Sequence, residues 1–135
     1  MPPPLWAQNL VIQVALDEGR NELPDLVWRK SRIQWGVSGH AKSGCLGQAD
    51  QITIKVGVPH PHYPIRTEQK IVLLHELAHW LLPVGEHHSP AFWDKAWSLF
   101  RRYRCPIKVA LAREGNYLKG AVTAYHRSVS PRKER

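Results

Sequence analysis

The sequence is most informative at residues 68–82, which read EQKIVLLHELAHWLL. Apolar residues occur on nearly every side of this segment, a pattern that predicts a helix buried in a core. Three polar residues interrupt the pattern, namely His75, Glu76 and His79. Burying them is costly, because polar groups removed from water need hydrogen bonds and a buried carboxylate needs a positive charge. A bound cation would meet both needs. A solvent-exposed stripe on one helix face would also satisfy these polar groups, but we favour the cation.

The spacing of these three residues is typical of a zinc site. His75 and His79 lie four residues apart, so both rings project from one face of a helix with about 3.6 residues per turn. Two imidazoles placed in this way can share one Zn²⁺ ion. Glu76 would lie beside the metal, where its carboxylate can take a proton from metal-bound water and pass it to a leaving group. We therefore predict one Zn²⁺ ion, with Glu76 as the general base and acid of a hydrolase.

A catalytic zinc site needs a third protein ligand and an open position. His88 is the leading candidate, because it directly precedes Ser89, which with the following proline is typical of the start of a helix. A ligand in that place would be held by a rigid helix. His87 is the main rival, and the carboxylates of Glu86 and Asp94 are weaker alternatives.

The segments HELAH at residues 75–79 and HSPAFW at residues 88–93 together resemble the SprT-like metalloprotease superfamily, which includes the Spartan proteases. The resemblance covers residues 51–100. It implies that His88 is the third ligand, because Phe92 falls at the family's aromatic position. It also implies a zinc metallopeptidase, with DNA-associated protein as a candidate substrate. The C-terminal zinc ribbon of some relatives is absent, since the chain has only two cysteines.

The whole chain predicts an α+β fold, in which a small antiparallel β-sheet packs against the HExxH helix, with further helices at both ends. The length of 135 residues fits one domain, expected at residues 1–126, followed by a basic disordered tail at residues 127–135. The clearest strand is residues 51–56, where isoleucine and valine alternate with polar residues. The other expected elements are, in chain order, an N-terminal helix ending near Gly19, strands at residues 26–33 and 43–49 around a loop at residues 36–44, a zinc helix capped by Thr67, a helix from Ser89 to the residues before Pro106, and a short helix at residues 107–118.

The formal net charge of +8 permits attraction to nucleic acid. Two groups of basic residues could contact phosphates, and a solvated surface explains them equally well. A non-catalytic module, stabilised by zinc and binding DNA or a regulatory partner, is therefore the alternative to an enzyme. The basic groups are Arg29, Lys30 and Arg32, and Arg101, Arg102 and Arg104.

Two features bear on a protein or peptide substrate. If the strand at residues 51–56 is a sheet edge beside the zinc, its free backbone groups could pair with an extended peptide. The loop before the zinc helix carries His60, His62 and Tyr63, which could contact substrate or stabilise an oxyanion. Solvent-exposed loop side chains are the simpler interpretation of these three residues.

The sequence also bears on location. Its longest apolar stretches are too short to cross a membrane, and its first residues lack the charged start and apolar run of a signal peptide. Cys45 and Cys105 are far apart and belong to no cysteine motif. We therefore expect a cytoplasmic protein that does not contact membranes, with both thiols reduced.

Overall fold

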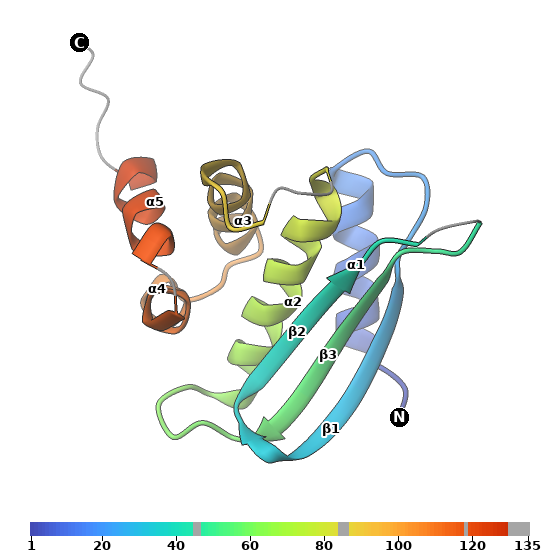
Figure 1. The fold of residues 1–135 in the computed structure, drawn as a ribbon, viewed down its shortest axis with the longest axis horizontal. Helices are drawn as coiled ribbons and strands as arrows, with labels where there is room; N and C mark the ends of the chain where they lie inside the picture. Colours follow the sequence, from blue (N-terminus) through green and yellow to red (C-terminus); the bar gives the residue numbers. More distant parts are fainter. Residues whose placement is uncertain (45–46, 84–86, 118, 130–135) are drawn as a thin grey trace.

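The computed structural model describes residues 1–44, 47–83, 87–117 and 119–129. Within these residues, helices cover one face of a three-stranded sheet (Figure 1), which confirms the α+β class. No described helix has the length and apolar character needed to cross a membrane. The elements are α1 (Leu5–Asp17), β1 (Asp25–Trp35), β2 (Val37–Lys42), β3 (Gln51–Val58), α2 (Ile65–Leu81), α3 (Pro90–Arg102), α4 (Ile107–Tyr117) and α5 (Lys119–Val129).

The sheet is mixed, with β3 as its central strand. β1 runs parallel to β3, with Trp28 opposite Ile54, and β2 runs antiparallel to β3, with Gly39 opposite the same residue. The expected antiparallel arrangement is thus correct for one of the two pairings. The path of the chain explains why the other pairing, between β1 and β3, is parallel. β1 and β2 are joined at Gly36, and β3 inserts between them, so it must run parallel to one and antiparallel to the other.

β2 occupies a stretch where the sequence predicts a loop. The strand expected at residues 43–49 is wrong for the described part of that range, and residues 45–46 lie outside the described residues. The glycines of residues 36–44 suggest turns, yet Gly39 lies within a strand and allows that strand to approach α2 closely. A Cβ atom at Gly39 would lie only 2.6 Å from Cγ of Glu76, so the missing side chain lets β2 pass directly against α2.

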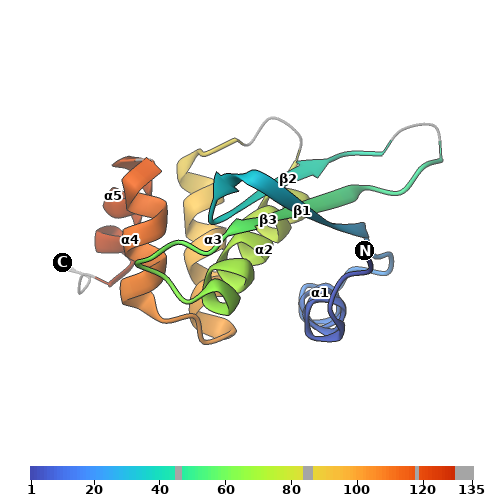
Figure 2. The same cartoon turned by 90° about the horizontal axis from the view of Figure 1, so that it is seen from below.

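The hydrophobic core lies between the sheet and α2. Ile52 and Ile54 of β3 have no exposed surface, and residues 71–78 of α2 are all buried. Helices α3, α4 and α5 form a second group beside α2 (Figure 2), which buries the indole rings of Trp93 and Trp97. The polar residues of α2 are therefore fixed between a sheet on one side and helices on the other.

Most helix boundaries agree with those predicted from the sequence. Ser89 caps α3 as expected, because its side chain accepts a hydrogen bond from the backbone N–H of Phe92. α2 begins earlier than predicted, so Pro64 rather than Thr67 is its N-terminal flanking residue. α5 is not predicted by the sequence analysis. It continues through Arg127 into the first residues of the expected tail, of which residues 130–135 lie outside the described part.

Candidate metal centre

Three imidazole rings meet beside the C-terminal half of α2. His75 and His79 project from one face of this helix, and His88 approaches from the segment just before α3. Nε2 of His88 lies 3.2 Å from Nε2 of His75 and 3.3 Å from Nε2 of His79. The ligand nitrogens of all three rings lie within 4.8 Å of one another. The structure thus brings together the three residues that the sequence predicts as ligands, and they could hold a metal ion.

The spacing of these nitrogens fits a tetrahedral cation. With zinc–nitrogen bonds of about 2.0–2.1 Å, two ligand nitrogens of a tetrahedral site are about 3.3 Å apart. The two separations at His88, 3.2 and 3.3 Å, have this value. Three imidazole ligands also leave a fourth position open, as in catalytic rather than structural zinc sites.

The protonation states of two rings suit metal binding. Burial, together with positive charge on His75 and His88, lowers the pKa of His79 to about 4. Burial, followed by the effect of His75, also lowers the pKa of His88. Both rings are therefore neutral at pH 7, and a neutral imidazole has the free lone pair that a metal ligand needs.

Two aromatic residues of α3 hold the rings in place. Phe92 stacks on His79, with ring centroids 4.1 Å apart and planes inclined by 22°. Trp93 stacks on His88 with centroids 5.6 Å apart. Both aromatic side chains are almost fully buried. The segment after His88 therefore contributes a rigid wall to the site as well as a ligand.

Glu76 lies between the histidines and β2. Its side chain is 6% exposed and packs over the backbone of Gly39. Burial raises the pKa of Glu76 to about 7, although positive charge on His75 opposes the shift. A carboxyl group with a pKa near 7 can accept and release a proton at neutral pH, as a general base and acid must do.

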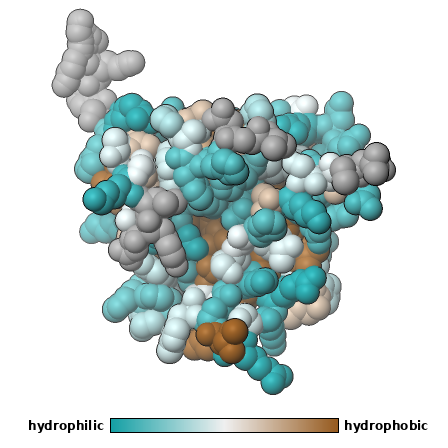
Figure 3. Space-filling model, viewed as in Figure 1, coloured by the Kyte–Doolittle hydropathy of each residue, from teal (hydrophilic) through white to brown (hydrophobic). Residues whose placement is uncertain are grey.

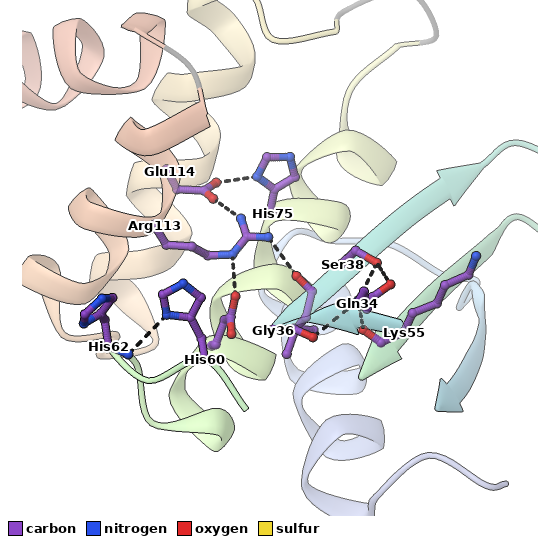
Figure 4. A network of polar contacts seen from close by, with 11 residues as sticks. Gln34, Gly36, Ser38, Lys55, His60, His62, His75, Arg113 and Glu114 are labelled. Atoms are coloured by element: carbon purple, nitrogen blue, oxygen red, sulfur yellow. Dashed lines mark hydrogen bonds and ion pairs between the residues drawn. The ribbon is translucent and has the colours of Figure 1, made fainter. Parts of the chain in front are cut away.

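α4 contributes two residues that the sequence analysis does not single out, Arg113 and Glu114 (Figure 4). One carboxylate oxygen of Glu114 contacts Nδ1 of His75, and the other accepts a hydrogen bond from Arg113. Burial alone would raise the pKa of Glu114, but the positive charges of His75 and Arg113 and their hydrogen bonds lower it. A pattern in the sequence could have indicated this pair. Ala110, Arg113 and Glu114 share one helix face by their spacing, and that face is buried.

A cavity of about 680 Å³ lies between α2 and β2. Residues 38–42 of β2 form one wall, and the three histidines with Glu76 form the other. β2 is an outer strand of the sheet, because it pairs only with β3 among the described strands. The condition considered above, that residues 51–56 form a sheet edge, is therefore not met. That segment lies in the central strand, whose neighbours on both sides use its backbone groups.

The loop before α2 does not reach the histidines. His60, His62 and Tyr63 precede the N-terminal end of α2, and His75 lies ten residues inside the helix, about 15 Å along its axis. None of the three residues lines the cavity. His60 instead stacks on Tyr63, with ring centroids 4.5 Å apart. The structure therefore places these three residues away from the histidine cluster, and their contact with a substrate stays a prediction.

The two rival ligands that the structure describes, His87 and Asp94, do not join the cluster. His87 lines the cavity but is not a member of the group of three. Asp94 forms an ion pair with Arg127 of α5, at 2.7 Å between oxygen and nitrogen. Glu86 lies outside the described residues, as does Cys45. Cys105 is a buried free thiol.

The two predicted groups of basic residues differ in their surroundings. Arg102 forms an ion pair with Glu18 at 3.0 Å, and Arg101 donates a hydrogen bond to Ser128 at 2.6 Å. The group of Arg29, Lys30 and Arg32 is exposed along β1, the other outer strand of the sheet. Figure 3 shows that the face seen in Figure 1 is mainly hydrophilic, with small apolar patches between polar residues.

Comparisons with protein-family models, curated proteins and solved structures find no match for this chain. The resemblance to the SprT-like superfamily thus stays a prediction. The chemical interpretation of the site depends on the positions of its own side chains.

Proposed function

We propose that the protein is a zinc-dependent metallopeptidase, in which His75, His79 and His88 hold one Zn²⁺ ion and Glu76 is the general base and acid. One observation carries the proposal. The Nε2 atoms of the three rings converge at separations of 3.2 and 3.3 Å about His88, beside a buried carboxyl group on the same helix.

A zinc ion at the three histidines would supply a Lewis acid and lower the pKa of a bound water to about 7. The side chains of the site would carry out the proton transfers and hold the cation. Glu76 lines the cavity next to His75, and in this proposal its carboxylate accepts the proton of the attacking water and delivers it to the leaving amine. The neutral rings of His79 and His88 keep their lone pairs available for the cation.

The position of β2 supports a peptide as substrate. Its residues line the cavity opposite the histidines, and as an outer strand it can pair with an extended chain through backbone N–H and C=O groups. Such pairing would align a scissile peptide bond beside the cluster whatever its side chains are. The close approach of Gly39 to Glu76 joins this strand to the proposed general base.

The test compares wild-type protein with Glu76→Gln, using an unstructured protein such as casein as substrate. We expect wild-type protein to contain one zinc per chain and to cleave the substrate, and the variant to keep zinc and lose cleavage. A variant that cleaves as fast as wild type would overturn the role of Glu76. Wild-type protein that binds zinc but cleaves nothing, with or without DNA, would refute the enzyme proposal.

A DNA-binding role is the second candidate. The net charge of +8 and the exposed group of Arg29, Lys30 and Arg32 on β1 favour it, because basic side chains along one strand can contact successive phosphates. This role is compatible with an enzyme acting on DNA-associated protein. It also fits a non-catalytic module, for which Glu76→Gln would leave function intact.

A further inference from the structure

The two ring nitrogens of His75 face in different directions. Nε2 faces His88 across 3.2 Å, inside the cluster. Nδ1 lies on the far side of the ring and contacts the carboxylate of Glu114 on α4. If Nε2 binds a cation, Nδ1 is the nitrogen that carries the hydrogen, and the partner of that hydrogen determines how the ring is oriented.

Glu114 is itself held by Arg113. Glu114 is 1% exposed, and its second oxygen accepts a hydrogen bond from the Arg113 guanidinium. Arg113 also donates to Oε2 of Glu68 on α2, at 3.3 Å, and to the carbonyl oxygen of Val37 at the start of β2, at 3.0 Å. The guanidinium therefore connects three elements, and the carboxylate of Glu114 has little freedom to move away from His75.

We propose that Glu114 is a positioning residue for the metal centre, with Arg113 as its support. Glu114 accepts the Nδ1–H of His75, which selects the tautomer whose Nε2 lone pair is aimed at the cation and fixes the plane of the ring. Its negative charge also makes the ring a stronger ligand. This inference rests on the metal site of the proposed function, and it assigns to α4 a part in that site.

The first experiment measures the zinc affinity of wild-type protein, Glu114→Gln and Glu114→Asp by competition with a chromophoric chelator. Glu18→Gln is the matched control, because Glu18 also accepts hydrogen bonds from two basic side chains, Lys95 and Arg102, away from the site. We expect Glu114→Gln to weaken zinc binding by about 10- to 100-fold, the range for loss of an outer partner of a ligand. Glu114→Asp should restore part of the loss, and the control should bind as wild type does.

Circular dichroism of the zinc-free proteins separates positioning from stability, since Glu114→Gln must keep its helical signal for the comparison to hold. The visible spectrum of bound Co²⁺ adds a direct readout of ligand geometry. A spectrum altered in Glu114→Gln and unchanged in Glu18→Gln supports positioning. Equal zinc affinities and identical Co²⁺ spectra in Glu114→Gln and wild type would overturn the proposal.

The second experiment needs no variant at Glu114, so a folding failure cannot obscure it. Long-range ¹H–¹⁵N correlation spectra of zinc-loaded wild-type protein report the tautomer of each histidine, with His75→Gln used for assignment. We expect His75 to bind zinc through Nε2 and to carry its hydrogen on Nδ1. The opposite tautomer would overturn the proposal even if zinc binds with three histidines.

The two proposals fail in different ways. If wild type and His88→Ala bind zinc equally, the three-histidine site is wrong, and the role of Glu114 falls with it. If zinc binding requires His88 but tolerates Glu114→Gln with an unchanged Co²⁺ spectrum, only the positioning role is overturned.

Discussion

Gly39 of β2 and Glu76 of α2 are packed so closely that position 39 has no room for a side chain. A Cβ atom there would lie 2.6 Å from Cγ and 2.9 Å from Oε2 of Glu76, and 2.9 Å from Cγ1 of Val72. The strand that borders the cavity and the proposed general base are therefore in direct contact. The position of Glu76 depends on the backbone of β2 as well as on α2.

This contact predicts the effect of Gly39→Ala. The added methyl group should displace Glu76 and the edge strand, lower casein cleavage by at least about tenfold, and destabilise the fold by about 1–3 kcal/mol. Zinc content should not change, because no histidine is touched. Activity per folded molecule and urea unfolding are the measurements.

Gly19→Ala is the matched control for that variant. Gly19 has φ of 71°, so alanine is strained there, but a Cβ atom would meet nothing within 4 Å. This control should lose stability and keep its activity per folded molecule. Equal activity losses in both variants would show that the contact with Glu76 is unimportant.

The third ligand can be tested by metal content. His88→Ala removes a ligand itself, so it should weaken zinc binding by more than the loss of a hydrogen-bond partner of a ligand does. We expect a loss of more than about 100-fold, the upper end of the range for such a partner. His87→Ala, which changes the neighbouring residue outside the group of three, should bind as wild type does. Elemental analysis after dialysis against a weak chelator distinguishes the two. Loss of zinc from His87→Ala alone would reverse the assignment.

The ion pairs of Glu18 predict a dependence of stability on pH. Burial tends to raise the pKa of Glu18, but hydrogen bonds from Lys95 and Arg102 outweigh it and lower the pKa below the ordinary value of 4.5. A carboxyl group with a lowered pKa stabilises the fold above its unfolded pKa, and this contribution is lost as pH falls through the folded pKa. Glu18→Gln should therefore cost about 0.5–1 kcal/mol at neutral pH.

The difference between wild type and Glu18→Gln should shrink as the pH falls below 4.5. Urea unfolding of both proteins in the presence of a chelator, at neutral pH and at about pH 3, measures it without a contribution from bound metal. A difference that grows on acidification would contradict the assignment of these ion pairs.

The exposed basic side chains of β1 predict a salt-dependent interaction with DNA. Arg29→Ala combined with Lys30→Ala should weaken binding to duplex DNA and reduce the slope of log affinity against log salt by about 0.9 for each phosphate that the variant no longer neutralises. Lys108→Ala combined with Lys119→Ala removes the same charge from exposed positions of α4 and α5. Equal effects of the two pairs would indicate that only net charge matters.

The sequence predicts the three clustered histidines because their signals are local. His75 and His79 are one helical turn apart, and Ser89 with its proline marks the start of α3 beside His88. The buried helix also follows from its own apolar residues. In these segments, neighbours along the chain are sufficient to determine the structure.

The sequence does not predict β2 or the role of Glu114, because both depend on distant residues. In the sequence alone, Gly39 suggests a turn, because its contact with Glu76 can be seen only in the folded structure. Glu114 reaches His75 across 39 positions of the chain. A local pattern can place Glu114 on one helix face with Ala110 and Arg113, but it does not show which distant residue Glu114 contacts. The mixed pairing of the sheet is missed for the same reason.

The central place of β3 has a consequence for how the chain acquires its structure during synthesis. In the part of the chain that the structure describes, β1 and β2 do not pair with each other, and each strand pairing of the sheet involves β3. A nascent chain that has reached Asp50 contains both outer strands and no partner for either of them. The sheet can assemble only after residues 51–58 leave the ribosome, and until then two unpaired strands are exposed to aggregation.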